Sequence, residues 1–411
     1  MREQLANITT RAVNAASRRL GRGQGTVAGG RAGLRVDPKL LEHLSAGRQV
    51  ALVSGTNGKT TTTRLLTVGL GALGDAVVSN ETGSNMPPGH VAALVSSHAA
   101  RAVLEVDEVY LPRVLTATGA TAVVLLNLSR DQLDRTNEVR MVAGRWRAAL
   151  AAAPHTHVVA NADDPLVVWG AGAARAVHWV GAGLRWQLDA VGCPSCEERI
   201  EFGEGSWSCT SCGFTRPDPE ANLVWSAEGT ATAVWRDGRT RPLRLALPGR
   251  FNQANALLAA VAAEACGVDA LAALEAMDSV DEVAGRFTVR SFGDVRARLM
   301  LAKNPAGWDE LLELVSAAMV PLVVSINARV ADGADPSWLW DVPFERLAGR
   351  IVVATGDRFR DLSVRLQYAG VAHSTAPYPV AAVVNAADGT GEVVDVIGNY
   401  TAFHDLLGAP A

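Results

Sequence analysis

Lysine is nearly absent from this sequence of 411 residues, where Lys39, Lys59 and Lys303 stand beside 35 arginines. Lysine is a compact charge on a flexible stem, whereas arginine is a planar fork, so the two do not substitute freely. A lysine that persists in so arginine-rich a chain therefore indicates a position that arginine cannot fill. Two of the three, Lys59 and Lys303, lie in segments that suit phosphate binding.

Long hydrophobic runs are also missing. No apolar stretch reaches the length of a membrane-spanning helix, and residues 1–23 lack the apolar block of a secretory signal, which predicts a cytoplasmic protein. Five cysteines in that compartment favour metal binding or free thiols over disulfides. A net charge of −4 gives no general attraction to nucleic acid. The length suits two or three domains.

Apolar runs alternate with helical stretches along much of the chain. Strands are predicted at 49–55, 102–106, 122–128 and 157–162. Their continuous apolar character predicts an α/β fold, in which helices cover both faces of a parallel sheet. A second series of strands and helices from about residue 290 predicts a smaller Rossmann-like α/β domain.

The N-terminal region is predicted to form a helix over 3–20, with a loop over 21–35. Arg11, Arg18 and Arg19 would lie on the surface of that helix. Packing against the rest of the protein is its simplest role, and a basic face near a membrane is the alternative.

A glycine-rich turn separates the first strand from a helix that begins near Thr60. The turn reads GTNGKT over residues 55–60, with Val53 where the strict Walker A pattern has its first glycine. Backbone N–H groups of such a turn and the helix N-terminus favour a polyphosphate. Lys59 would reach the terminal phosphates, and the Thr60 hydroxyl would bind Mg²⁺.

The segments GTNGKT, PGRFNQANALLAA, AGRF and KNPAG together resemble the Mur ligase superfamily over residues 45–411. The resemblance implies three regions: 1–48, a helix and loop; 49–290, a central ATP-binding domain; and 291–411, an α/β domain. It also implies a reaction in which ATP phosphorylates a substrate carboxylate and an amine displaces the phosphate.

The resemblance implies site residues as well. Glu105, in LEVDE, would bind Mg²⁺ with Thr60, and Glu108 is the second choice. Lys303 would face the site from the C-terminal domain. The implied nucleotide contacts are Gly55, Thr56, Asn57, Gly58, Lys59, Thr60, Thr61, Asn252, Asn255, Arg286 and Lys303.

The chain departs from ordinary Mur ligases around RDQLDR. Gln132, between Asp131 and Asp134, stands where a histidine commonly helps to hold a second metal. Because glutamine is a weak neutral ligand, a second metal is in doubt. The chain before residue 55 is also too short for the usual UDP-sugar domain.

These departures, with two CxxC pairs and the segment ADGADPSWLWD, resemble one branch of the family. Its members amidate the D-glutamate α-carboxyl of lipid II at the inner face of the membrane. Ammonia comes from a separate glutaminase subunit of the GatD type. The resemblance therefore implies a lipid II substrate and a glutaminase partner.

Four cysteines, Cys193, Cys196, Cys209 and Cys212, form the pattern C-x₂-C-x₁₂-C-x₂-C in an insertion at about 187–225. Two such pairs supply four thiolates for a tetrahedral zinc ion with no open position, which predicts a structural site. The insertion is acidic, so nucleic-acid binding is disfavoured. Cys266, in an Ala-rich helix, is predicted to be a buried apolar residue.

The segment ADGADPSWLWD combines acidic residues with Trp338 and Trp340. The simple interpretation is a loop with a helix cap and packed tryptophans. The family resemblance instead implies that an aspartate here completes the Cys–His pair of the glutaminase. Asp335 is the first choice and Asp341 the second; Asp332 also lies in the motif.

Two alternative functions remain open from the sequence. One is a ligase that joins an amino acid to a carboxylate, as folylpolyglutamate synthases do. The other is a P-loop ATPase that uses its zinc ribbon as a scaffold or to bind nucleic acid. Gly83, Ser84 and Asn85 are candidates for a substrate loop.

Overall fold

The computed structural model describes residues 1–19, 26–80, 84–130, 139–183, 186–226, 230–281, 283, 286–316, 320–387 and 393–409. The chain divides into two compact units. The first comprises Met1–Ser129 and Asn137–Asp281, and the second comprises Arg130–Thr136 and Glu282–Ala411. Among the described helices, none combines the length and the apolar character needed to cross a membrane.

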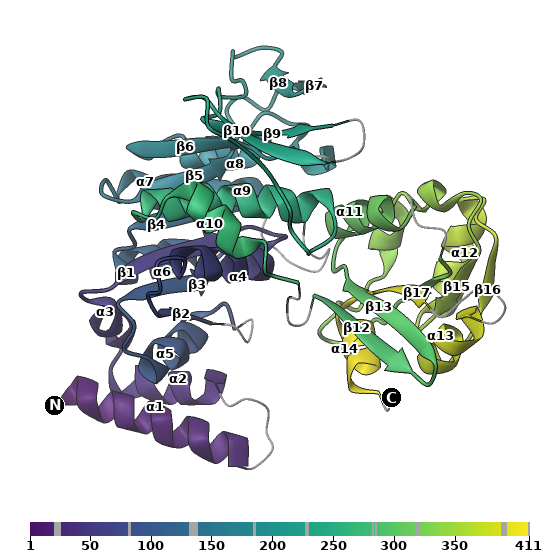
Figure 1. Cartoon of the computed structure of the whole chain (residues 1–411), viewed down its shortest axis with the longest axis horizontal. Coiled ribbons are helices and arrows are strands. Elements are labelled where there is room, and N and C mark those ends of the chain that lie inside the picture. Colours follow the sequence, from purple (N-terminus) through teal and green to yellow (C-terminus); the bar gives the residue numbers. More distant parts are fainter. Residues whose placement is uncertain are drawn as a thin grey trace. The chain divides into compact units, whose positions relative to one another are not determined.

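The first unit is built on a nine-stranded sheet in the order β11-β10-β9-β6-β5-β4-β1-β3-β2 (Figure 1). Strands β1 to β6 and β9 pair in parallel, whereas β10 and β11 are antiparallel additions at one edge. The strands are β1 Gln49–Ser54, β2 Val77–Ser79, β3 Arg101–Glu105, β4 Ala122–Leu125, β5 His157–Asn161, β6 Ala176–Gly181, β9 Ala221–Trp225, β10 Ala231–Trp235 and β11 Thr240–Pro242.

Helices cover both faces of this sheet, as its buried strands require. One face carries α4 Lys59–Leu70, α9 Arg250–Ala265 and α10 Ala270–Met277. The other carries α3 Leu40–Ser45, α5 Pro87–Ser96, α6 Leu111–Thr118, α7 Val139–Ala151 and α8 Pro165–Ala171, around a core that includes fully buried Trp146. The predicted parallel α/β sheet is therefore confirmed.

The predicted loop over 21–35 is wrong, because a helix, α2 (Thr26–Val36), occupies most of it and packs on α1 (Arg2–Arg19). Glycine disfavours helices in isolation. Here it permits close packing: a Cβ on Gly29 would lie 1.9 Å from Asn14 Oδ1, and one on Gly33 would lie 2.1 Å from Thr10 Oγ1. Tertiary contact thus overrides the weak local preference.

The insertion forms a separate small hairpin, β7 (Ile200–Gly203) with β8 (Ser206–Cys209), preceded by a short 3₁₀ turn η1 (Leu188–Ala190). Trp207 and Ile200 are buried in a local cluster with Val168 of α8. Apolar contact therefore joins the hairpin to the first unit.

The second unit has a six-stranded sheet in the order β12-β13-β17-β14-β15-β16, parallel except for β12. Its strands are β12 Phe287–Phe292, β13 Val295–Leu301, β14 Leu322–Ser325, β15 Val352–Thr355, β16 His373–Thr375 and β17 Val393–Gly398. Its helices are α11 Pro305–Ser316, η2 Ser337–Asp341, η3 Phe344–Leu347, α12 Phe359–Tyr368, α13 Pro379–Ala387 and α14 Tyr400–Gly408. This is the predicted smaller α/β architecture.

Candidate functional site

The candidate site of the first unit lies at the carboxyl ends of its parallel strands. Ligands bind at this edge in open α/β sheets, because the loops there lie close together. The loop after β1 holds the glycine turn, β3 ends at Glu105, and the segment after β4 holds Asn127. Strands β1 and β3 pair in parallel, with Val53 opposite Glu105, so that Glu105 lies next to the start of the glycine turn.

The glycine turn adopts the backbone that its sequence requires. Gly55 has a φ of 145° and Gly58 has a φ of 85°, a region that L residues rarely adopt. Side-chain space is also absent, since a Cβ on Gly55 would lie 2.9 Å from Leu126 Cβ, and one on Gly58 would lie 2.8 Å from Asn255 Oδ1. Both glycines are therefore required by backbone and by packing.

The segment after β4 braces the glycine turn. Thr56 N–H donates to Asn127 O at 2.9 Å, and Asn57 N–H donates to Asn127 Oδ1 at 2.9 Å. In return, Asn127 Nδ2 donates to Asn57 O at 3.1 Å, and Ser129 N–H donates to Thr56 Oγ1 at 3.0 Å. The turn is thus held in place from a neighbouring strand, a role of Asn127 that the sequence analysis missed.

Lys59, the first residue of α4, is buried within the turn. Its Nζ donates to Gly55 O at 2.5 Å and Thr56 O at 3.1 Å, and it pairs with Glu108 Oε2 at 3.0 Å. A compact ammonium can make these three contacts from one point, which a planar guanidinium cannot. Thr60 and Thr61 follow on the first turn of α4, at the N-terminal end of the helix dipole.

Glu105 is buried at the end of β3, and its main chain is held by side chains. Asn80 accepts from Glu105 N–H at 2.8 Å and donates to Glu105 O at 2.9 Å, as the next residue of a paired strand would. His90 Nε2 lies 2.8 Å from the same carbonyl oxygen, and Asn85 Nδ2 lies 3.4 Å from Glu105 Oε1. The carboxylate is therefore fixed beside the predicted substrate-loop residue Asn85.

His90 is fully buried, and this burial lowers the pKa of its imidazole to about 4. Its other ring nitrogen, Nδ1, is buried without a partner. The ring is consequently neutral near pH 7, with Nε2–H donating to Glu105 O. Neither Asn80 nor His90 stood out in the sequence, because their partner is a main-chain group.

Asn252 and Asn255 lie on the first turns of α9, buried on one side of the helix. Asn255 contacts the turn at Gly58. Asn252 Nδ2 donates to Pro248 O at 2.6 Å, while its Oδ1 is buried with no partner. A buried amide oxygen without a partner suits a ligand with N–H donors, such as an adenine amino group.

Arg286 and Lys303 belong to the second unit, where the charges of both act on His404. The Lys303 ammonium stands 5.2 Å from the centre of the Tyr400 ring. Burial, followed by the charges of Arg286 and Lys303, lowers the pKa of His404. The second unit therefore carries a cationic group of its own around the start of α14, which suits phosphate.

The acidic motif divides into anchored and exposed parts. Asp332 is buried and accepts from Thr401 N–H at 2.8 Å and from Thr401 Oγ1 at 2.5 Å. Asp335 is exposed, and its Oδ1 accepts from Ser337 N–H at 2.9 Å at the start of η2. Asp332 therefore fixes the loop to α14, while the Asp335 carboxylate remains at the surface.

The two tryptophans of the motif differ in the same way. Trp338 is buried against Trp308, at 6.2 Å between ring centroids, as a packing residue. Trp340 is exposed and meets the exposed Tyr368 edge-on at 5.4 Å. An exposed aromatic pair is typical of a protein interface. Asp341, the second choice, is only partly exposed.

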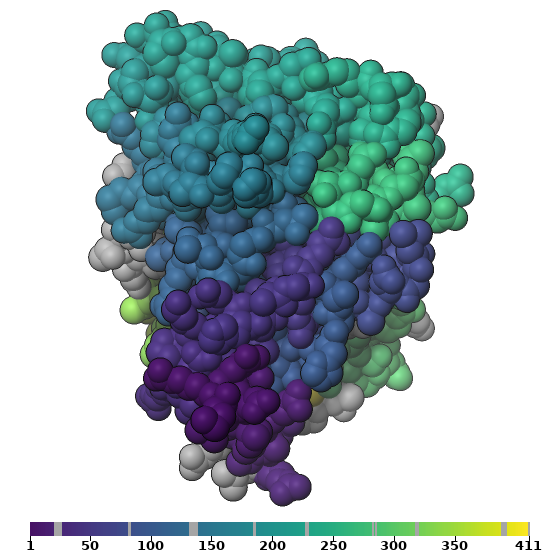
Figure 2. Space-filling model, turned by 90° about the vertical axis from the view of Figure 1, so that its left-hand side faces the viewer, coloured from purple at the N-terminus to yellow at the C-terminus, as the bar shows by residue number. Residues whose placement is uncertain are grey.

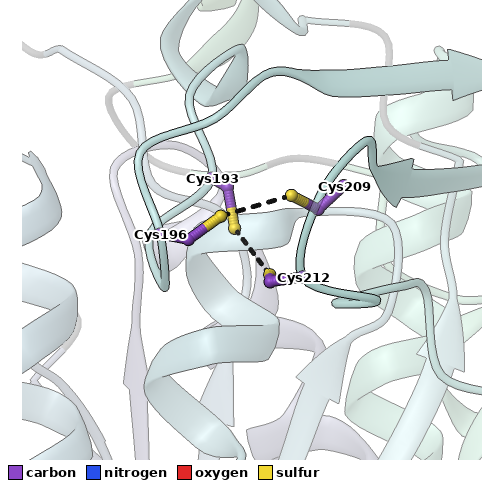
Figure 3. Close-up of side chains that lie close together, drawn as sticks. All are labelled: Cys193, Cys196, Cys209 and Cys212. Atoms are coloured by element: carbon purple, nitrogen blue, oxygen red, sulfur yellow. Dashed lines mark hydrogen bonds between the residues drawn. The ribbon is translucent and has the colours of Figure 1, made fainter.

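The four cysteines of the insertion converge from two loops (Figure 3). Their Sγ atoms all lie within 4.8 Å of one another, with Cys193 and Cys212 at 3.7 Å and Cys196 and Cys209 at 3.5 Å. Sulfur atoms about 3.8 Å apart form the corners of a tetrahedron whose metal–sulfur bonds are about 2.3 Å. The cluster therefore has the size to hold a metal ion.

Each cysteine pair is followed by a residue whose backbone adopts a left-handed conformation. Gly213, after Cys212, has a φ of 74°, and Glu197, after Cys196, has a φ of 71°. Glu197 is the only non-glycine residue with positive φ in the described part of the chain. Backbone N–H donors of Cys212 and Ser211 lower the pKa of Cys209, whereas burial raises the pKa of Cys193.

The cysteine hairpin is fastened to the same edge of the sheet as the glycine turn. Trp207 Nε1 donates to Ala162 O at 3.1 Å, and Arg216 Nε pairs with Asp163 Oδ1 at 2.6 Å. Asp164, the next residue, caps α8 and also accepts from Leu128 N–H at 2.8 Å. One short segment after β5 thus connects the cysteine hairpin to the segment after β4 that braces the glycine turn.

Some predicted positions fall outside the described residues. These are Gly83 of the substrate loop and the segment with Asp131, Gln132 and Asp134, so the doubt about a second metal is not tested. Ser84 is described, and its main-chain oxygen accepts from Asn80 Nδ2 at 3.0 Å.

Comparison with protein families gives two matches. Residues 53–183 match the Mur ligase middle domain, and residues 301–403 match the MurT ligase C-terminal domain. The first match contains the glycine turn and Glu105, and the second contains the acidic motif and Lys303. The two matches therefore fall on different units.

Two curated relatives span most of the chain. "Lipid II isoglutaminyl synthase (glutamine-hydrolyzing) subunit MurT" of Streptococcus pneumoniae is 29% identical over 85% of this chain and 83% of that protein. The protein of the same name from Staphylococcus aureus is 28% identical over 90% of this chain and 89% of that protein. The fold is similar to that of a pseudomurein peptide ligase type C from Methanothermus fervidus, with a TM-score of 0.69, 20% identity, and 88% and 78% of the two chains covered.

Proposed function

Because the chain belongs to the MurT group of Mur ligases, we propose that it amidates the D-glutamate α-carboxyl of lipid II to D-isoglutamine in peptidoglycan synthesis. The chain is an ATP-dependent ligase that forms a carbon–nitrogen bond. The observation that carries the proposal is the presence of a Mur ligase nucleotide unit and a MurT C-terminal unit in one chain. A glutaminase subunit of the GatD type is the proposed source of ammonia.

The reaction has two balanced steps. A carboxylate oxygen of the substrate attacks the γ-phosphorus of ATP, and ADP leaves with the electron pair of the broken P–O bond. Ammonia then attacks the carbonyl carbon of the acyl phosphate, and phosphate leaves as the amide forms and one proton is released. Phosphorylation is needed because a carboxylate alone has no leaving group that ammonia could displace.

The residues of the first unit fit these steps. Lys59, held by the carbonyls of the turn, would donate to the phosphates in exchange for Glu108. Glu105 and Thr60 would hold Mg²⁺, which neutralises charge on the phosphates when bound. Asn252 Oδ1, buried without a partner, would accept from the adenine. Arg286 and Lys303 of the second unit are proposed as further phosphate contacts.

We also propose that the cysteine cluster holds zinc in a structural role. Four thiolates fill a tetrahedral site and leave no position for a reacting water molecule. The hairpin has few buried side chains of its own, so a metal would replace the missing core.

Asp335 is the proposed link to the partner. Its exposed carboxylate would orient the histidine of the glutaminase and stabilise the imidazolium, as the third member of a triad does. The proposed site of action is the inner face of the membrane.

The test uses the chain purified together with a GatD-type glutaminase and supplied with lipid II, Mg²⁺ and ATP. Amidation lowers the mass of lipid II by about one dalton, and we expect this shift with either glutamine or ammonium salts. Asp335→Asn should abolish the glutamine-driven shift and retain the ammonium-driven one.

Asp341→Asn tests the second choice for this role and should retain both activities; loss of its glutamine-driven activity alone would assign the role to Asp341 rather than Asp335. Equal loss of both activities in Asp335→Asn would contradict its role toward the partner. A wild-type complex that makes no amide from either nitrogen source would contradict the proposed function itself.

A further inference from the structure

Positive charge is concentrated at the start of the chain. Residues 1–36 contain seven arginines and a single acidic residue, Glu3, for a net charge of +6. Because the whole chain carries −4, the remaining residues carry −10. Such an asymmetry is typical of a segment with its own anionic partner rather than of general solubility.

The outer face of α1 is apolar at its centre. Met1, Leu5 and Ile8 are exposed by 104%, 57% and 64%, and the small Ala12 and Ala16 continue the same face toward Arg19. This spacing of three and four residues places the side chains in one stripe on the helix. Arg11 and Arg18 flank it, and both are exposed.

The opposite face of α1 attaches the helix firmly to the protein. Ala6, Thr10 and Asn14 are buried against α2, where Gly29 and Gly33 allow close packing. Arg11 Nη2 donates to Val95 O at 3.0 Å in α5, and Arg2 Nε donates to Val36 O at 2.8 Å. These contacts therefore hold the helix that carries the stripe in place. The first residues of the chain lie at the surface of the molecule (Figure 2, dark purple).

Helices α1 and α2 form a helical hairpin, which lies against α5, the helix that follows the predicted substrate loop. Gly30 of α2 packs so closely on α5 that a Cβ would lie 1.8 Å from Pro88 O. The turn before α5 contains Asn85, which reaches Glu105. A surface that holds α1 would consequently lie close, through α2 and α5, to residues of the candidate active site.

We propose that the outer face of α1, with the exposed arginines of α1 and α2, docks the protein on an anionic lipid bilayer. The arginines concerned are Arg18, Arg19, Arg31 and Arg35, because the Arg11 guanidinium already donates to Val95 O. Leu5 and Ile8 would enter the interfacial region while the guanidinium groups meet lipid phosphates. The inference deepens the proposed function, since it rests on a substrate that is carried by the membrane.

The test measures flotation with vesicles of phosphatidylcholine, made with and without phosphatidylglycerol. The chain and its complex with the glutaminase should float only with phosphatidylglycerol, and less so at high salt. Arg18→Gln with Arg19→Gln should weaken binding roughly fivefold per arginine. Leu5→Ser with Ile8→Ser should weaken it roughly tenfold or more.

Matched controls are Arg113→Gln with Arg244→Gln, and Leu73→Ser, all exposed and outside the hairpin. These should bind vesicles as the wild type does. Absence of flotation, equal flotation with pure phosphatidylcholine, or flotation that survives both double variants would overturn the proposal. Flotation of the chain but not of its complex would overturn it too, because the partner would then cover the face.

An amidation assay distinguishes failure of the membrane-docking proposal from failure of the proposed function on which it rests. The hairpin variants should amidate lipid II in detergent at the wild-type rate and lipid II in vesicles more slowly. If the wild-type complex amidates neither, the proposed function fails while flotation still decides the docking surface.

Discussion

At the scale of single residues, Lys59 is both the proposed phosphate-binding group and a buried side chain that holds the glycine turn together. Its ammonium is surrounded by two carbonyl oxygens and the Glu108 carboxylate, all within 3.1 Å. These contacts leave no room for the breadth of a guanidinium, which explains why lysine persists in an arginine-rich chain.

We expect Lys59→Arg to lower the amidation rate about 10²- to 10³-fold, the usual effect of losing one donor to developing charge. Steady-state kinetics with ammonium as nitrogen source measures this without involving the partner's catalysis. The control is Lys39→Arg, whose exposed side chain pairs only loosely with Glu42 at 4.0 Å. A Lys59→Arg enzyme with normal turnover would show that the lysine is only structural.

His90 predicts a pH dependence of stability. Its pKa is about 4 in the folded chain and about 6.5 when unfolded, so the unfolded state binds the extra proton between these values. The free energy of unfolding should therefore fall as pH drops from 6.5 to 4, by about 3 kcal/mol from this group.

Denaturant titrations of His90→Gln over that pH range should lack this part of the decrease. His98→Gln, at an exposed position, should retain it. An identical pH profile for the wild type and His90→Gln would show that the histidine is not buried in its neutral form.

At the scale of elements, the proposed zinc ion would stabilise the cysteine hairpin more than its small apolar cluster does. We expect Cys212→Ser to lose bound zinc and to expose Trp207, which is now buried beside Phe214 at 5.0 Å. Metal analysis and tryptophan fluorescence measure the two effects, and removal of zinc from the wild type by a chelator should reproduce them.

Cys266→Ser is the matched control, because Cys266 is a buried cysteine outside the cluster. It should keep one zinc ion per chain. Wild-type protein that purifies without zinc, or Cys212→Ser that keeps it, would exclude the proposed metal site.

Elements with a local signature could be predicted from the sequence. The glycine turn stands between strand and helix as expected, and the CxxC pairs converge as their spacing indicates. Helix α2 could not be predicted, because its glycines are favourable only where Thr10 and Asn14 pack against them. The strand-like role of Asn80 was hidden for a similar reason, since its partner, Glu105, lies 25 residues away.

At the scale of the whole molecule, the α/β class and the family followed from motifs distributed along the chain. The choice between neighbouring acidic residues did not. Glu105 and Glu108 are only three residues apart in the sequence. The Glu105 carboxylate nevertheless lies beside Asn85, whereas the Glu108 carboxylate pairs with Lys59. Asp332 and Asp335 also differ in a way that the local sequence does not reveal. Asp332 is buried because it accepts from Thr401, which lies 69 residues later, whereas Asp335 is exposed.

The separation of charge between the first 36 residues and the rest has a consequence for encounter. A negatively charged sheet of lipid attracts one end of the first unit and repels the acidic remainder. The resulting torque would turn the first unit before contact, so that most collisions of this unit would begin with the hairpin of α1 and α2. Salt screens the charges that produce this torque. The fraction of collisions that begin with the hairpin of α1 and α2 should therefore fall as the salt concentration rises.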